Sequence, residues 1–414
     1  MKKTKAAEEG GEDRISELPD ALLHQVLSLL PVDEAVQTSV LARRWRGLWK
    51  GMPVLRLVGP KKRFPSAEDF DRFVNRLISV RGDSPLVTCE IEAYLTWDDY
   101  AGEPEEPEPN VHFHSWIQYA LACKVRVLKV VGDHIGSETE LVVPLVSRHL
   151  TSLDVSHVFL DKDFVHFACC LVLEELDMRH CGFWVRSMSF PSLKRLHLTE
   201  CNFPEGHRVR VSAPSIVSLR LHDCRGKTPL FESMPSLETA SIDLSHGCKD
   251  QCRGGCGDES CEGCHGYPVG SYQSVLLNSL SNAVNLELKD QPKVFVSDDY
   301  DRHYVELSIS AIDLHALVRI LQHTPILEKL TLQLRSDENF LSAARGESRK
   351  HVRIEQSFAC ANLKEVNIEC EEKLRVKDKV RQIVKILSKS GIRNEQISVK
   401  KIPRPEGCKL TIDI

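Results

Sequence analysis

Three stretches, LEELDMRHC (173–181), LKRLHLTEC (193–201) and IVSLRLHDC (216–224), decide the fold of this chain. Each has apolar residues at its first, fourth and sixth positions and a cysteine at its ninth. A fourth stretch, LTSLDVSHV (150–158), has the same spacing with valine at the ninth position. The stretches begin at residues 150, 173, 193 and 216, which are 23, 20 and 23 residues apart. This period predicts a solenoid of stacked coils, each contributing one short strand.

The residues within one stretch fit a short strand and a tight turn. Alternate residues such as Leu196 and Leu198 point to the same side of a strand, and the ninth-position cysteine is small enough to lie inside the coil. The spacing is typical of leucine-rich repeats, in which Asn or Cys occupies that position. The alternative is a set of unrelated strands in an α/β domain, which does not explain three cysteines in one register. We therefore predict an α/β fold built around an irregular leucine-rich repeat solenoid.

The repeat pattern weakens on both sides of these stretches but can still be followed. We expect further strands in VRVLKVVG (125–132), around Leu237 and Ile242, in VNLELKD (284–290), and in the segments beginning at Leu327 and Leu363. Two loops interrupt the pattern, an acidic, proline-rich one at 98–110 and a cysteine-rich one at 245–272. The repeat region is placed at 53–345. Target-binding residues are not predicted, because strand-face positions such as Arg179, Arg220 and His222 look like ordinary solvated residues.

The segment 13–52 has the pattern of three short helices. Leu22, Leu23, Val26, Leu27 and Leu30 form an apolar stripe at helical spacing that ends at Pro31. Asp33 is a candidate N-cap for a second helix, and a third would contain the apolar residues Trp45, Leu48 and Trp49. A domain of about 40 residues buries too little of its own apolar surface, so a partner should cover part of the stripe. An ordinary three-helix start to a larger domain is the alternative.

The residues DRISELPDALLHQVLSLLPVDEAVQTSVLARRWRGLW (13–49) closely resemble the F-box of plant F-box proteins. In that family, three helices dock on the adaptor Skp1, which links them to a cullin and a RING subunit of a ubiquitin ligase. The resemblance implies that nine residues form or support the Skp1-facing surface: Leu18, Pro19, Leu23, Leu27, Leu30, Pro31, Val40, Leu41 and Trp45. Residues 1–12, which precede it, are polar and expected to be disordered.

The C-terminal segment 351–414 predicts a strand, a helix and a second strand. Val380, Ile383, Val384 and Leu387 mark one face of the helix, and Gly391 is a natural end for it. LKEVNI (363–368) and VKILSKSGI (384–392) resemble the FBD region that ends many plant F-box and leucine-rich repeat proteins. Such a unit could cap the open end of the solenoid.

The cysteine-rich segment 245–272 is the one candidate metal site. Its candidate ligands are Cys248, Cys252, Cys256, Cys261, Cys264 and His265, and zinc is the metal that such residues favour. Only Cys261 and Cys264 form a C-x-x-C pair, and no second pair lies at the usual separation. A glycine-rich loop without metal is therefore the preferred interpretation, and no cofactor is expected.

Composition and missing motifs exclude several other functions. The net charge of -5 argues against nucleic-acid binding, and no apolar run is long enough to cross a bilayer. The chain contains no phosphate loop, nucleophile elbow, zinc-protease motif or dinucleotide fingerprint, so we do not expect an enzyme. It is expected to be soluble and intracellular, in the nucleus, the cytoplasm or both. The basic residues Lys61, Lys62 and Arg63 are too few to count as a nuclear localisation signal, so they do not decide between the two compartments.

Three functions remain open at this stage. The first is a substrate receptor of a Skp1–cullin–F-box ubiquitin ligase that binds Skp1 through the F-box and a target through the repeats, and so promotes the target's ubiquitination and degradation. The second is a scaffold that binds Skp1 without directing ubiquitin transfer. The third is a regulator that holds a metal in the cysteine-rich loop.

Overall fold

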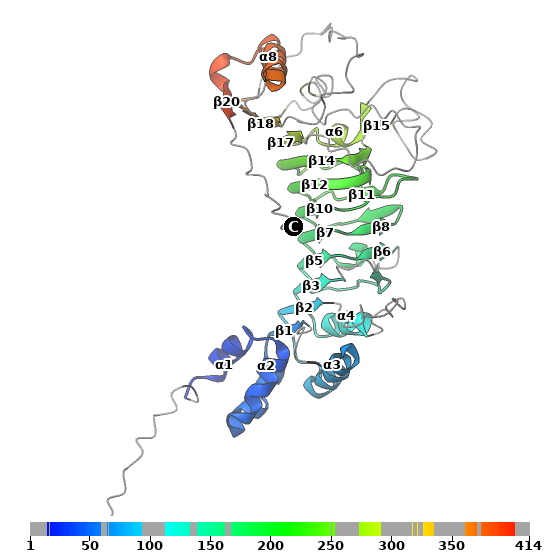
Figure 1. Cartoon of the computed structure of the whole chain (residues 1–414), viewed down its shortest axis with the longest axis vertical. Helices are drawn as coiled ribbons and strands as arrows, with labels where there is room; N and C mark the ends of the chain where they lie inside the picture. The colour runs from blue at the N-terminus through cyan, green and yellow to red at the C-terminus, as the bar shows by residue number, and fades with distance from the viewer. Residues whose placement is uncertain are drawn as a thin grey trace, which may run out of the picture. The chain divides into compact units, whose positions relative to one another are not determined.

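The computed structural model describes residues 15, 17–58, 64, 66–92, 112–132, 139–161, 167–249, 251–252, 273–290, 317, 321, 326–334, 360, 362–370 and 374–401. The chain divides into two compact units, Met1–Ser137 and Glu138–Ile414, and we describe each by itself. Figure 1 shows the helices of the first unit and the ladder of strands in the second.

The first unit begins with short helices. They are α1 (Asp20–Leu27), α2 (Val32–Gln37) and the 3₁₀ turns η1 (Thr38–Val40), η2 (Arg43–Arg46) and η3 (Leu48–Gly51). Pro19 and Pro31 precede the first residues of α1 and α2, where a missing N–H costs nothing. Asp33 was predicted as an N-cap, but it lies inside the first turn of α2, because the helix already begins at Val32. The predicted third helix is instead η2 and η3, which meet at Gly47.

The rest of the first unit alternates strands and helices. It contains β1 (Val54–Leu57), α3 (Ala67–Arg81), β2 (Thr88–Glu92), α4 (Phe113–Ala122) and β3 (Val127–Val131), and β2 pairs in parallel with both β1 and β3. Phe70 of α3 packs edge-on against Trp116 of α4, with ring centroids 5.8 Å apart. The strand predicted in 125–132 is confirmed by β3. Sequence reasoning missed β1, because four residues are too few to show a period.

The second unit contains a parallel sheet of nine strands in the order β5-β7-β10-β12-β14-β17-β18-β19-β20. Their bounds are Ser152–Ser156, Glu175–Arg179, Arg195–Thr199, Ser218–Lys227, Thr239–Lys249, Asn285–Asp290, Lys329–Leu334, Glu365–Cys370 and Ile397–Lys401. The register aligns the repeats, so that Leu196 pairs with Leu176 on one side and Leu219 on the other. A chain of mixed α/β structure with a largely parallel sheet is therefore confirmed.

The three aligned cysteines form a buried column inside the coil. Cys181, Cys201 and Cys224 are each 0% exposed. The Cys201 thiol lies 3.5 Å from the Met178 carbonyl of the preceding repeat and 3.5 Å from the Thr199 carbonyl of its own. The other two cysteines make the same pair of contacts. The carbonyls of Arg179, Thr199 and His222 also accept a backbone amide from the preceding repeat, so the thiols add a second bond at each of these turns.

The residue before each cysteine position takes a left-handed backbone conformation. His157, His180, Glu200 and Asp223 have φ values of 55°, 51°, 53° and 50°. A non-glycine residue rarely adopts this conformation, so its recurrence at one register shows that the turn is imposed by the stacking. The sequence does not reveal this turn, because none of the four residues is glycine.

Short strands, rather than helices, return the chain between the middle repeats. Two small sheets lie on the side opposite the main strands in Figure 1, with the orders β4-β6-β8 and β9-β11-β13. Their bounds are Glu140–Leu141, Phe159–Asp161, Gly182–Trp184, Ser187–Ser189, Arg210–Ser212 and Leu230–Phe231; the turn η4 (Phe167–Cys169) accompanies them. Phe183, Val185, Met188 and Phe190 are buried. Their close spacing does not follow a helical period, which explains why these returns are extended.

The C-terminal part has the predicted strand, helix and strand. Helix α8 (Leu374–Lys389) lies between β19 and β20 in the chain and is followed by the turn η5 (Asn394–Gln396). Gly391 has φ +87°, and the Ile392 amide donates to the Leu387 carbonyl, as expected for a glycine-ended helix. That this unit caps the solenoid stays a prediction.

The cysteine-rich segment lies only partly within the described residues. The strand β14 extends to Lys249, and β15 (Gln251–Cys252) pairs antiparallel with β16 (Gln273–Ser274), which leads into α6 (Val275–Ser279). Cys248 and Cys252 therefore stand in strands, where only their backbone is described. Cys256, Cys261, Cys264 and His265 lie outside the described residues.

Candidate functional site

The apolar stripe of α1 has two faces with different surroundings. Leu23 and Leu27 are 0% and 1% exposed and pack inward. Leu22 and Val26, on the adjoining face, are 44% and 48% exposed. Leu23 and Leu27 already supply the apolar face through which α1 packs on its own unit. The second apolar face, formed by Leu22 and Val26, is therefore available to another molecule.

More apolar side chains stand in the open on the turns that follow. Leu29 is 77% exposed, Val40 87% and Leu41 68%, and Ile15, before α1, is 60% exposed. Together with Leu22 and Val26, these residues form what we call the exposed apolar set. Six large apolar side chains left in water within residues 15–41 indicate a surface that a protein partner covers.

A buried base holds these turns in place. Trp45, Leu48 and Trp49 of η2 and η3 are 6%, 7% and 7% exposed. They fill the space under α1 and α2, where Ala35 and Val32 are also buried. The exposed side chains are therefore presented on a packed support rather than on a free loop.

An arginine ties the start of α1 to η2. Arg44 donates from Nη2 to the Leu18 carbonyl at 2.7 Å and from Nε to Asp20 Oδ1 at 3.1 Å. Both side chains are substantially exposed, so the ion pair contributes little stability. Its effect is geometric, because it fixes the Leu18–Pro19 turn beside η2.

The nine residues predicted for Skp1 binding fall into three groups. Leu23, Leu27 and Trp45 are buried and can only support the surface. Leu18, Leu30 and Pro31 are half-buried, whereas Pro19, Val40 and Leu41 are exposed. The prediction did not include Leu22, Val26, Leu29 or Ile15. The helical spacing of Leu22 and Val26 puts them on a different face of α1 from the buried Leu23 and Leu27, and this spacing could have identified them as a second apolar face.

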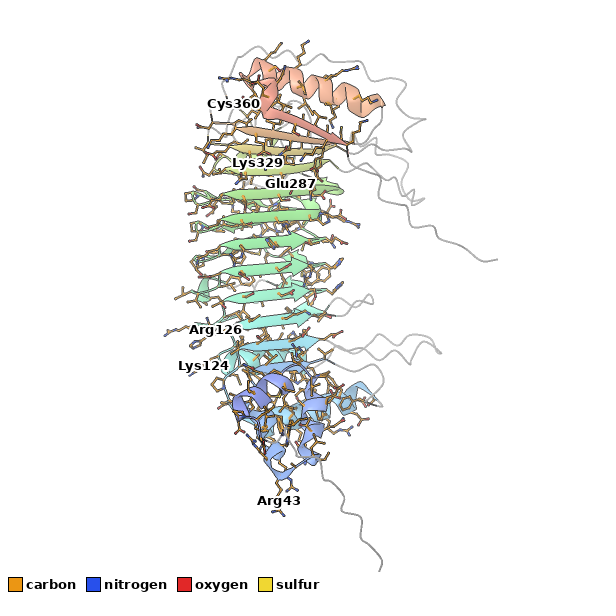
Figure 2. All side chains as sticks on the ribbon, turned by 90° about the vertical axis from the view of Figure 1, so that its left-hand side faces the viewer. Arg43, Lys124, Arg126, Glu287, Lys329 and Cys360 are labelled. Atoms are coloured by element: carbon orange, nitrogen blue, oxygen red, sulfur yellow. The ribbon has the colours of Figure 1, made fainter. Side chains whose placement is uncertain are left out.

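The outward side of the parallel sheet in the second unit is a polar surface, which we call the strand face and which Figure 2 views directly. Most of its charges are neutralised by a neighbour on the face. Arg179 reaches both carboxylate oxygens of Asp154, at 2.6 and 2.7 Å, and lies 3.5 Å from Asp177. The other pairs are Arg195 with Glu175, His222 with Asp243 (2.8 Å), Lys289 with Glu287 (3.7 Å) and Lys329 with Glu365 (3.2 Å).

The described residues contain neither a metal centre nor a membrane-spanning helix. No group of three or more His, Cys, Asp or Glu side chains there is placed to hold a metal ion. No helix within the same residues is long and apolar enough to span a membrane. The side chains of the candidate zinc ligands lie outside these residues.

Known proteins resemble this chain over its first residues and over more than half of its length. Residues 15–57 match the F-box domain family. An F-box/LRR-repeat protein of Arabidopsis thaliana is 32% identical over 271 residues, which cover 58% of this chain and 70% of the relative. The chain belongs to the F-box/leucine-rich repeat proteins. A putative F-box/FBD/LRR-repeat protein and a putative FBD-associated F-box protein of the same plant are each 29% identical, over 56% and 57% of this chain.

These last two matches cover 58% and 60% of the relatives' own lengths. Their names support the predicted FBD resemblance of this F-box/leucine-rich repeat protein. An F-box domain implies a partner of the Skp1 type. The exposed apolar set lies within the matched residues 15–57.

Proposed function

We propose that this protein is the substrate receptor of a Skp1–cullin–F-box ubiquitin ligase. The exposed apolar set is the observation that supports adaptor binding most directly, since six large apolar side chains at 44–87% exposure within one short segment are typical of a surface that a partner covers. The adaptor would cover Leu29, Val40 and Leu41, with Leu22 and Val26 of α1 alongside. Leu23, Leu27 and Trp45 would support this surface from beneath.

The second part of the proposal concerns the target. The strand face offers a broad polar surface, which suits a protein ligand better than a small molecule. In such a complex the receptor performs no chemistry. It raises the local concentration of the target beside the ubiquitin-transferring subunits, which is catalysis by proximity.

The adaptor contact can be tested with a pair of matched variants. In Val40→Asp/Leu41→Asp, two apolar contacts are replaced by charges that the adaptor interface cannot accept. Burial of two such side chains is worth about 1.5–3 kcal/mol each, so we expect adaptor binding to weaken at least about 100-fold. Val142→Asp/Val146→Asp is the control, because these valines are also exposed, at 42% and 57%, but lie in the second unit.

Binding would be measured by titrating the purified Skp1-type adaptor against each variant. Equal affinity of the first variant and the wild type, with circular dichroism unchanged, would show that the adaptor does not use this surface. Ubiquitination of a bound target in a reconstituted ligase then separates the receptor from a scaffold. A target that binds the repeats but gains no ubiquitin would favour the scaffold.

A further inference from the structure

The strand face contains one cation that its neighbours do not neutralise. In the register-aligned part of β5 to β19, which in β12 is Ser218–His222, the described outward-facing arginine and lysine side chains each have an ion pair, except Arg220 of β12. Arg220 is exposed, and among the described residues no side chain forms a hydrogen bond or ion pair with it. A guanidinium that the fold does not use is free to bind an anion from outside.

The neighbours of Arg220 are suited to an incoming ligand. Ser218 precedes it on the same face of β12, and Ser241 stands opposite it on β14. Both side chains are short, so a peptide can approach the guanidinium closely. Ser241 already donates to Glu287 at 2.7 Å, which fixes its hydroxyl away from Arg220.

A second polar group stands on the other side. His197 of β10 pairs in register with Arg220. Burial lowers the pKa of His197, and Arg220 lowers it further, while Asp177 acts in the opposite direction. The ring is therefore neutral at physiological pH, and it keeps one N–H to donate to an anion without adding a charge.

Charge complementarity determines which chemical group the surface around Arg220 binds. A cation between a neutral imidazole and two serines favours a carboxylate, which matches the fork of the guanidinium with two parallel hydrogen bonds. We propose that Arg220, assisted by His197, anchors an Asp or Glu side chain in an extended, acidic segment of the target protein. This inference rests on the proposed function and names the chemistry of its target site.

The probe is a displayed library of random peptides of about a dozen residues. Such a peptide is about 40 Å long when extended, enough to cross about eight strands at their usual spacing of ~4.8 Å. The library would be selected on the full chain bound to its Skp1-type adaptor. We expect enriched peptides to share one acidic position, and Asp→Asn at that position to weaken binding about 10- to 100-fold.

Three variants test the anchor itself. Arg220→Ala should weaken the selected peptide to the same extent as Asp→Asn, and the two changes together should cost no more than either alone, because both remove one interaction. Arg220→Lys, which keeps the charge and loses the fork, should recover part of the affinity. Lys400→Ala is the matched control, because it removes one exposed positive charge from β20, at the end of the same sheet.

The possible results separate the anchor from the proposed function. Equal effects of Arg220→Ala and Lys400→Ala, no enriched acidic position, or no enriched peptide at all would overturn the anchor. A strong preference for phosphoserine over Asp at the shared position would also overturn the carboxylate assignment. None of these results affects adaptor binding, so failure of the proposed function would show itself separately, as loss of the Skp1-type partner.

Discussion

At the scale of single residues, Arg81 connects three parts of the first unit. It is 4% exposed at the end of α3, and its guanidinium donates to the Met52 carbonyl after η3 (3.0 Å), the Ser84 carbonyl (2.7 Å) and the Tyr119 hydroxyl of α4 (2.9 Å). Tyr119 in turn donates to the Gly82 carbonyl at 2.8 Å. Burial raises the pKa of Tyr119 to about 12, so the phenol stays protonated and can make this bond.

We expect Arg81→Ala to lower the free energy of unfolding by about 3 kcal/mol. Each hydrogen bond to a charged group contributes about 1.5–3 kcal/mol, and the carbonyls left behind would be buried without a donor. Arg81→Lys should restore little of this, because an ammonium cannot reach acceptors spread around a planar fork. Urea unfolding of the three proteins measures the differences.

Tyr119→Phe is the matched control for this prediction. It removes one hydroxyl from the same cluster and leaves the contacts of Arg81 with the backbone, so the expected loss is about 1 kcal/mol. A loss for Arg81→Ala no larger than that of Tyr119→Phe would mean that Arg81 does not hold the cluster together.

At the scale of elements, the column of buried cysteines makes repeat stability depend on pH. Burial raises the pKa of Cys201 well above its usual value, and in Cys224 the hydrogen bond to Cys201, together with burial, also raises the pKa well above its usual value. Above about pH 8.5 the unfolded chain loses these thiol protons while the folded chain keeps them. The unfolded state then binds fewer protons, so stability falls as the pH rises.

We therefore predict that the free energy of unfolding falls with pH in the alkaline range. Between pH 9 and 10, each such thiol should lower the free energy of unfolding by up to about 1.4 kcal/mol. Cys201→Ala/Cys224→Ala should be less stable than wild type at pH 7 and show a shallower fall above pH 9. Cys169→Ala, at an exposed position, is the control and should leave the slope unchanged. Identical slopes in all three proteins would refute the assignment.

The elements also show what a sequence can and cannot predict. Strands β7, β10 and β12 follow from their leucines, because alternation and a fixed period are local properties. The return strands β6, β8 and β9 do not, since three residues show no period. Of the six residues of the exposed apolar set, only Val40 and Leu41 were predicted. Helical phase separates Leu22 from Leu23, but it does not say which of the two apolar faces turns to the core. Arg220 could not be singled out, because its lack of an ion pair depends on neighbours that the register brings together.

At the scale of the whole molecule, the F-box and the first repeats share one structure. The family match ends at residue 57, so it includes β1, which pairs with β2. The amides of Val87 and Thr88 both donate to the Pro53 carbonyl, at 2.7 and 3.1 Å. Arg81 binds the Met52 carbonyl, and Arg56 of β1 pairs with Glu90 of β2 at 3.5 Å. Deleting the F-box therefore removes an edge strand and buried hydrogen-bond acceptors as well as the adaptor contact.

We accordingly expect deletion of residues 1–57 to unfold the neighbouring part of the first unit. Hydrogen exchange should become fast in β2 and β3, because β2 loses its partner strand and Arg81 loses an acceptor, and stay slow in β7, β10 and β12 of the second unit. Val40→Asp/Leu41→Asp, which changes only exposed side chains, should abolish adaptor binding with exchange in β2 unchanged. Mass spectrometry after exchange measures both. Slow exchange in β2 after the deletion would show that the F-box is a separable module, and a plain truncation would then suffice to isolate the role of the adaptor.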